Sequence, residues 1–346
     1  MRKTSIKDIA AKANVSIATV SYVLNGTRNV RLETRERIVA AIEELKYKPN
    51  AIAQSLKLNR TNTIGVIAED VTVFNTPEII DGINDFGDKH DLHILLVNLR
   101  LHKRIGRNFS NMEDYRKYVD AAVADLLSNQ VDGIIYIGVH PRDLTGLIDT
   151  EDKPIVYTYS YAQDEISIQY NDEQASYLAM THLIRQGHRR IAIISGLMDS
   201  IPSRLRLNGY YRAITEFQLP FDPLLIKMGD WERESGYRLT SELLALPEPP
   251  TAILSMNDVM AVGVLEAAEE RGVQVPQKLS VIGFDNREFS DYLRPRITSM
   301  GLPLHEMGYQ ALEVLHSLIN GNKPEAPSMP ECRLVERDSV SGISTL

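Results

Sequence analysis

Short apolar runs that alternate with helix-length amphipathic segments constrain the fold of this chain most strongly. From Thr63 onward, the runs TIGVIA, LHILLV, VDGIIYIG and PIVYTYS are separated by helical patterns. A second series, ISIQY, RIAIISG, LIKMG, TAILS and SVIGFD, follows in the same way. Alternating strands and helices are typical of a parallel sheet covered on both faces by helices. The sequence therefore predicts two doubly wound α/β lobes.

Two such lobes in one chain create a cleft, and ligands of open α/β sheets bind beyond the carboxyl ends of the strands. No G-x-G-x-x-G or Walker-type loop follows any of these runs, so we expect no nucleotide cofactor. The eight histidines are scattered, no Cys/His spacing resembles a zinc site, and no nucleophile stands beside a base. We therefore expect neither a metal nor an enzyme.

The charge of the chain is unevenly distributed. Residues 1–60 contain 12 Lys/Arg against 5 Asp/Glu, whereas the whole chain has a net charge of −8. A short basic head on an acidic body indicates that the head meets a polyanion. The single cysteine, and the lack of an apolar run long enough for a signal peptide or a membrane span, favour a reducing compartment, the cytoplasm.

The basic head has the pattern of three short helices. Ser5 and Asp8 form a capping box before the first helix, and Ser16 caps a second helix, IATVSYVLN, after a tight turn. A third stripe of apolar residues begins at Ile38. Three such helices predict a helix-turn-helix domain, although a small bundle with no DNA role would show the same stripes.

The amino-acid sequence of the head resembles that of the lac/gal repressor family. TSIKDIAAKANVSIATVSYVLNGT matches its helix-turn-helix, and TRERIVAAIEELKYKPNAIAQSLK matches its third helix and hinge. The resemblance implies that bases are read by Ile17, Ala18 and Tyr22 and that phosphates or sugars are approached by Ser16, Thr19, Ser21, Asn25, Thr34, Tyr47 and Asn50. The alternative for Tyr22 is a half-buried ring that packs on the neighbouring helix.

The segment NAIAQSLKL resembles the hinge of the same family, which folds when two chains meet over the minor groove. In that picture Leu56 is an apolar wedge between central base pairs, and Ala53 lines the same contact. A linker leucine that only docks is the alternative. The family resemblance also implies a homodimer that binds a near-palindromic DNA operator.

The body resembles the effector domain of this family, which is built like periplasmic sugar-binding proteins. The segments that match the family are GHRRIAIISG, SRLRLNGY, GDWERESG, MNDVMAVG and SVIGFDN. They imply a small sugar as the effector, stacked on an aromatic platform and held by polar side chains. The residues that match effector contacts are Val73, Asn75, Ile79, Arg206, Trp231, Asn257 and Asp285. The pair Asn171-Asp172 reverses the Asp-Asn order that is frequent at this position.

Each effector residue has a structural alternative. Arg206 and Asp285 would form an interlobe salt bridge, Trp231 would belong to the core, and Asn257 would cap the following helix. Val73 and Ile79 would be packing residues.

The domain boundaries follow from the same patterns. We expect a helix-turn-helix domain at 1–49, a hinge at 50–60 and a two-lobed ligand-binding and dimerisation domain at 61–346. Within the last of these, lobe 1 is expected at about 61–161 plus 294–328 and lobe 2 at about 162–293 plus 329–346.

The resulting prediction is a sugar-controlled repressor of carbohydrate-utilisation genes. Ligand in the cleft would favour one closure of the lobes, and closure would set the spacing of the two hinges. A free-standing sugar-binding protein is the alternative, since it would share the body but not the basic head.

Overall fold

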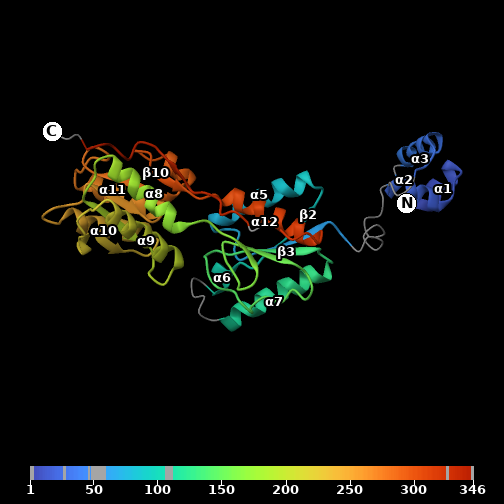
Figure 1. The fold of residues 1–346 in the computed structure, drawn as a ribbon, viewed down its shortest axis with the longest axis horizontal. Coiled ribbons are helices and arrows are strands. Elements are labelled where there is room, and N and C mark those ends of the chain that lie inside the picture. Colours follow the sequence, from blue (N-terminus) through green and yellow to red (C-terminus); the bar gives the residue numbers. More distant parts are fainter. Residues whose placement is uncertain are drawn as a thin grey trace. The chain divides into compact units, whose positions relative to one another are not determined.

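The computed structural model describes residues 4–25, 29–45, 47, 60–105, 112–324 and 327–343. The chain divides into two compact units, residues 1–62 and residues 63–346. The first unit is helical, and the second contains two sheets with helices around them (Figure 1). The predicted fold class, a helical head followed by two parallel-sheet α/β lobes, is confirmed.

The helical unit consists of α1 (Ile6–Ala13), α2 (Ile17–Asn25) and α3 (Leu32–Glu44). Its small core is formed by the fully buried Ile9, Val20 and Ile38, one from each helix. The Asp8 carboxylate accepts hydrogen bonds from the backbone N–H of Ser5 at 2.8 Å and from its hydroxyl at 2.7 Å. These contacts fix the start of α1, as the capping-box pattern predicts.

The first sheet consists of β1 (Thr63–Ala68), β2 (His93–Asn98), β3 (Gly133–Ile137), β4 (Ile155–Thr158) and β5 (Ile166–Ile168). The strands are parallel and lie in the order β2-β1-β3-β4-β5. The interior strands β3 and β4 are buried at every residue, which is typical of a parallel sheet covered on both faces.

The helices of the first lobe are α5 (Asn75–Lys89), α6 (Leu101–Ile105), α7 (Met112–Ser128) and α12 (Leu304–Ile319). α5 and α12 cross at very close range. A Cβ atom at Gly82 would lie 1.9 Å from the carbonyl oxygen of His305, and one at Gly308 would lie 1.9 Å from that of Ile79. Only glycine lets the two backbones approach this closely. α12 is therefore part of the first lobe although it follows a strand of the second.

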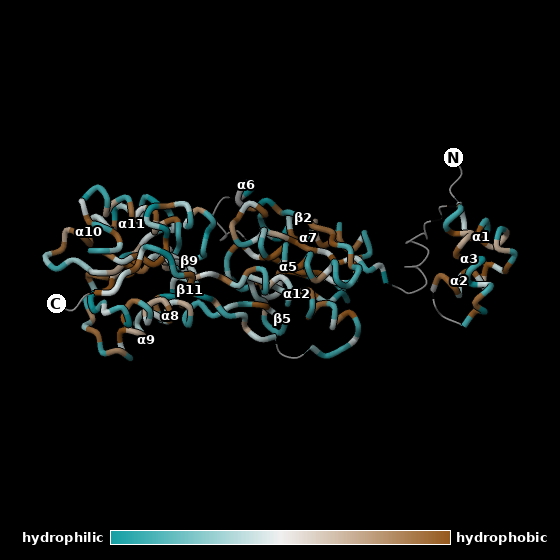
Figure 2. The backbone as a smooth tube through the Cα atoms, turned by 90° about the horizontal axis from the view of Figure 1, so that it is seen from above, coloured by the Kyte–Doolittle hydropathy of each residue, from teal (hydrophilic) through white to brown (hydrophobic). Residues whose placement is uncertain are grey.

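The second sheet consists of β6 (Ile191–Ser195), β7 (Ile226–Met228), β8 (Ala252–Ser255), β9 (Ser280–Asp285), β10 (Thr298–Gly301) and β11 (Arg333–Val335). The order is β11-β10-β9-β8-β6-β7, and only β11 runs antiparallel to its neighbour. The helices of this lobe are α8 (Asp172–Arg185), α9 (Ile201–Glu216), α10 (Arg233–Leu244) and α11 (Asp258–Glu270), with 3-10 turns at Pro223–Leu225 and Glu288–Asp291. In Figure 2 the hydrophobic stretches of the α/β unit lie mainly in its interior, where these strands are buried.

Two of the expected lobe boundaries are wrong. β5 pairs with β4 in the first sheet, although it falls at the start of the range expected for lobe 2. β10 pairs with β9 in the second sheet, although it falls within the range expected for lobe 1. Both strands are short, and a short strand does not reveal in its sequence which sheet it joins, because that choice depends on long-range pairing. The chain thus passes between the lobes after β5, after β10 and after α12.

Candidate functional site

The first turns of α2 present the side chains that were predicted to read bases. Ile17 is 45% exposed, and Ala18 is exposed beside it. Tyr22 lies one turn further along and is half-buried, which leaves room for both the base-reading interpretation and the packing alternative. An exposed apolar side chain on a small basic unit is available for contact with a thymine methyl group in the major groove.

The residues predicted to approach the DNA backbone fall into three groups. Ser16 caps α2, since its hydroxyl accepts the backbone N–H of Thr19 at 3.1 Å, and the two hydroxyls lie 2.8 Å apart. Tyr47 is half-buried against the core of the helical unit. Ser21 and Thr34 are also half-buried. The described residues do not include Asn50, Ala53, Leu56 or the side chain of Asn25.

Trp231, the single tryptophan of the chain, is held in a fixed turn in the second lobe. Its φ angle is +74°, a left-handed conformation that is rare for a bulky residue. Its carbonyl accepts the side-chain N–H of Asn257 at 2.9 Å. The indole lies against the backbone of Gly196, where a Cβ atom would come within 2.0 Å of Cε2 and Cζ2. Trp231 as a whole is half-buried, and its contact with Gly196 supports the flat indole ring.

The side chain of Asn257 forms two hydrogen bonds. Its side-chain oxygen accepts the backbone N–H of Met260 at 2.7 Å and caps α11. Its side-chain N–H tethers Trp231, as described above. The predicted alternative, a helix cap, is therefore present, and the same amide also orients the platform.

A buried polar cluster surrounds Arg206, which projects from α9 and is 2% exposed. Its Nε donates to Asp172 at 2.7 Å, and Nη2 donates to the Tyr170 hydroxyl at 3.2 Å. Nη1 donates to the Met256 carbonyl and lies 3.8 Å from the Asp285 carboxylate. Three of its five N–H groups thus have hydrogen-bond partners, and two carboxylates lie beside its positive charge. The Arg206–Asp285 pair lies inside the second lobe, so the predicted interlobe salt bridge is wrong.

Asp285 ends β9 in a strained conformation, with a φ angle of +93°. Its carboxylate is 6% exposed, and burial raises its pKa to about 7 although Arg206 opposes the shift. The group therefore changes charge within the physiological range. Perturbed carboxyl groups at the ends of parallel strands are typical of binding sites.

The first-lobe candidates are placed differently from one another. Ile79 is completely buried in α5 at the crossing with α12, which favours the packing alternative. Val73 is half-buried in the turn before α5. Asn75 is completely buried; its amide nitrogen donates to the Gly138 carbonyl at 2.9 Å, while its side-chain oxygen has no hydrogen-bond partner. Trp231 Nε1 is likewise buried without a partner. A ligand or water would satisfy such groups.

Several residues of this region were not assigned from the sequence. Asp172 pairs with Arg206, while its neighbour Asn171 caps α8 by accepting the N–H of Gln174 at 2.9 Å. In the Asn-Asp order of this chain, the first residue thus caps the helix and the second forms the ion pair. The guanidinium carbon of Arg206 lies over the ring of Phe284, 3.9 Å from the ring centroid. From the first lobe, His140 reaches Trp231, with the ring centroids 6.4 Å apart. No pattern in the sequence indicates that a single histidine in a loop lies next to this tryptophan.

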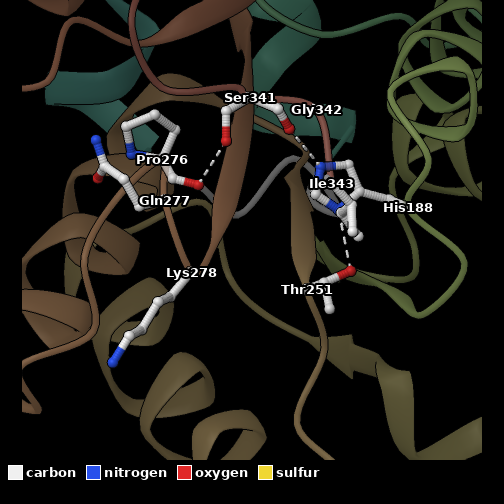
Figure 3. Close-up of a pocket in the computed structure, with 8 residues that line it drawn as sticks. All are labelled: His188, Thr251, Pro276, Gln277, Lys278, Ser341, Gly342 and Ile343. Carbon is white, nitrogen blue, oxygen red and sulfur yellow. Dashed lines mark hydrogen bonds between the residues drawn. The ribbon is translucent and has the colours of Figure 1, made fainter. Parts of the chain in front are cut away.

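A separate cavity of about 320 Å³ lies at the opposite, amino-terminal edge of the second sheet (Figure 3). The Nδ1 atom of His188 forms a hydrogen bond with the hydroxyl of Thr251, just before β8, at 3.0 Å. Its Nε2 atom forms one with the carbonyl oxygen of Ser341 at 3.1 Å. The Ser341 hydroxyl donates to the Pro276 carbonyl at 3.0 Å. These bonds attach the C-terminal segment to the lobe, so the cavity is explained by packing of that segment.

Within the described residues, no group of three or more His, Cys, Asp or Glu side chains is arranged to hold a metal ion. The same part of the chain contains no helix that is long and apolar enough to cross a membrane.

Comparisons with known proteins agree with this architecture. Residues 5–50 match the bacterial regulatory proteins of the lacI family, and residues 180–340 match the periplasmic binding protein-like domain. The chain is 35% identical over 320 residues to catabolite control protein A of Priestia megaterium, which covers 91% of this chain and 92% of that protein. It is 34% identical over 344 residues to the HTH-type transcriptional repressor PurR of Escherichia coli O139:H28, with 97% of each covered.

Solved structures show the same similarity. The Lac repressor dimer bound to operator and the anti-inducer ONPF has a TM-score of 0.77 and 28% identity, covering 99% of this chain and all of that one. The complex of the transcriptional regulator CelR with cellobiose has a TM-score of 0.64 and 26% identity, covering 97% of this chain and all of that one. The chain belongs to the LacI family of bacterial regulatory proteins. It is a DNA-binding transcriptional repressor with a ligand-binding domain, and it is not an enzyme.

Proposed function

We propose that this repressor is controlled by a small uncharged sugar, which binds between the two lobes and changes the affinity of a homodimer for a near-palindromic operator. The target genes are then those of carbohydrate utilisation. The observation that carries the proposal is the Trp231 surface beside the buried Arg206 cluster. An aromatic face covers the C–H face of a pyranose, and charged groups at its edge bind vicinal hydroxyls.

The balance of charge around Arg206 supports an uncharged ligand. Asp172 and Asp285 are both buried beside the single guanidinium, so the cluster is neutral or negative, depending on the protonation of Asp285. A phosphate group brought to this cluster would meet like charge in a poorly hydrated environment. Hydroxyl groups, in contrast, accept from the two remaining Arg206 N–H groups and donate to the Asp285 carboxylate. The solved CelR–cellobiose complex is a structural neighbour that holds such a ligand.

The DNA-binding part of the proposal rests on the exposed start of α2 and on the resemblance of the segment NAIAQSLKL to the hinge of the family. Ile17, Ala18 and Tyr22 read base edges, and the backbone contacts named from the family resemblance set the register. Leu56 enters the minor groove and Ala53 lines the same contact, in agreement with a hinge that folds on DNA. The two heads of a homodimer read two half-sites. A regulator of this kind works beside the chromosome, in the cytoplasm.

The test of the effector site is replacement of Trp231 by alanine. We expect Trp231→Ala to lose the response of operator binding to sugars while it keeps operator affinity in the absence of sugar. The matched control is Phe221→Ala, since Phe221 is an aromatic residue of the same lobe that is 60% exposed. Operator binding is measured by fluorescence anisotropy with and without D-glucose, D-galactose, D-ribose, maltose and cellobiose, and with a purine base, adenine, for comparison.

The outcomes separate the ligand classes. A response of the wild type to one of these sugars that disappears only in Trp231→Ala supports the proposal, and its direction shows whether the sugar releases or strengthens DNA binding. A sugar response that persists in Trp231→Ala overturns the location of the site. A wild type that responds to a purine base and to no sugar overturns the sugar assignment.

A further inference from the structure

A second buried polar cluster lies in the first lobe, around Glu69. This residue directly follows β1 and is completely buried. Its Oε1 accepts the hydroxyl of Tyr115, from α7, at 2.6 Å and the hydroxyl of Tyr136, from β3, at 2.7 Å, together with the guanidinium of Arg142. Its Oε2 accepts the backbone N–H of Val139 at 2.8 Å. The repressor function described above uses none of these contacts.

The cluster holds one short loop from both ends. Val139 and Arg142 flank His140, which follows β3 at the carboxyl edge of the first sheet. Because Glu69 binds the backbone on one side of His140 and a side chain on the other, this loop cannot move without breaking a contact with a completely buried carboxylate. A buried carboxylate that loses its partners is costly, and these contacts therefore fix the geometry of the loop.

His140, the residue in the middle of this loop, lies beside the proposed effector site. His140 is exposed, and its ring lies 6.4 Å from the indole of Trp231 with an interplanar angle of 39°. The two rings come from different lobes. A histidine there offers both a hydrogen-bonding nitrogen and a flat face to a ligand that rests on Trp231.

We propose that His140 is the first-lobe contact of the effector and that Glu69 is its positioning residue. The proposal rests on the sugar-binding function proposed above and adds to it the second wall of the site. The Tyr115 and Tyr136 hydroxyls serve as donors to the carboxylate. Burial is the main reason that the pKa of both phenols is raised well above the usual value, and the negative charge of Glu69 is the second reason. Both phenols therefore remain protonated donors.

The first experiment separates His140 and the cluster from ordinary packing. Sugar binding is measured by the change in Trp231 emission with the five-sugar panel, using the sugar that changes the wild-type signal most. We expect His140→Ala to weaken binding about tenfold, with recovery in His140→Gln, which keeps hydrogen-bonding groups. Tyr136→Phe removes one bond to Glu69, and we expect a loss of about threefold.

Tyr157→Phe is the matched control for Tyr136→Phe. Tyr157 lies directly opposite Tyr136 in the sheet register and is also buried, but within the described residues its hydroxyl is not a donor to Glu69. We expect wild-type sugar binding in this control. Wild-type affinity in His140→Ala would overturn the inference, and the proposed function would still stand if the operator binding of Trp231→Ala, followed by anisotropy, no longer responds to the sugar. Failure of every sugar to change wild-type emission would overturn both.

The second experiment tests the positioning role without a ligand. A bimane label at His140→Cys, in a Cys332→Ser background, is quenched when it contacts the single tryptophan. We expect strong quenching, its loss in Trp231→Phe, and at least a twofold reduction when Glu69→Gln or Tyr136→Phe is added. Tyr157→Phe should leave the quenching unchanged. Equal quenching with and without the Glu69 and Tyr136 substitutions would show that Glu69 does not position this loop, and would overturn that part of the inference.

Discussion

Replacement of Gly196 by alanine tests the platform most sharply. The added Cβ atom would lie 2.0 Å from two indole carbons of Trp231, whereas carbon atoms in contact are separated by about 3.5–4.0 Å. The ring must therefore move by about 1.5 Å, and overpacking of this kind costs about 1–3 kcal/mol of stability. Because the backbone of Gly196 lies under the ring, the movement is toward the solvent-exposed side of the site.

The expected result is a red shift of tryptophan emission and weaker sugar binding. Loss of one aromatic stacking contact, about 0.5–1.5 kcal/mol, corresponds to a reduction in affinity of about two- to tenfold. Since Trp231 is the single tryptophan, its emission reports this site alone. Gly87→Ala is the control, because its Cβ would meet its nearest neighbour at an ordinary 3.5 Å.

A second substitution distinguishes ring displacement from general damage. Trp231→Leu removes the indole, so adding Gly196→Ala to it should cost much less stability than Gly196→Ala costs alone, as measured by urea unfolding followed by circular dichroism. If Gly196→Ala leaves both emission and sugar affinity at wild-type values, the indole does not rest on this glycine and the account of the platform is refuted.

Three further predictions concern the hinge, Asp285 and Asn257. Leu56→Ala should weaken specific operator binding at least tenfold and spare nonspecific binding; equal losses in both anisotropy titrations would remove the wedge hypothesis. Because the pKa of Asp285 is about 7, sugar affinity should rise between pH 6 and pH 8 as the carboxylate ionises and accepts hydroxyls, and Asp285→Asn should flatten that profile. The native pKa exceeds the ordinary 3.8, so the contribution of this group to the free energy of unfolding falls as the pH rises from about 4 to 7. Asn257→Ala should lose about 1–2 kcal/mol of stability with the cap and the tether to Trp231, whereas Asn257→Ser should regain the cap but not the sugar affinity; full affinity in the serine variant would contradict the tether.

The parts of the fold that depend on local patterns could be predicted from the sequence. The helices of the head and the alternation of strands and helices follow from apolar periodicity, which is a short-range property. The partners of β5 and β10 could not be predicted, since each strand is only three or four residues long and joins a sheet by contacts remote in sequence. The close crossing of α5 and α12 depends on Gly82 and Gly308, whose roles become visible only when the helices are in place.

The candidate site divides in the same way. Trp231, Arg206 and Asp285 were assigned through the family resemblance, and the structure brings them together in one lobe. Asp172 was not assigned, because only the folded chain shows that it pairs with Arg206 rather than capping α8. His140 was also missed, because its placement depends on a buried carboxylate about seventy residues earlier in the chain.

The central claim, a dimeric repressor that responds to a sugar, is tested most directly by selecting bound duplexes from a random DNA pool at physiological salt, with and without the panel of sugars. The account predicts enrichment of a near-palindrome with a deformable central step, and one sugar that changes the enrichment. Enrichment of the same palindrome regardless of every sugar would contradict the proposed effector, and enrichment of a single, asymmetric half-site would contradict the dimeric mode of reading.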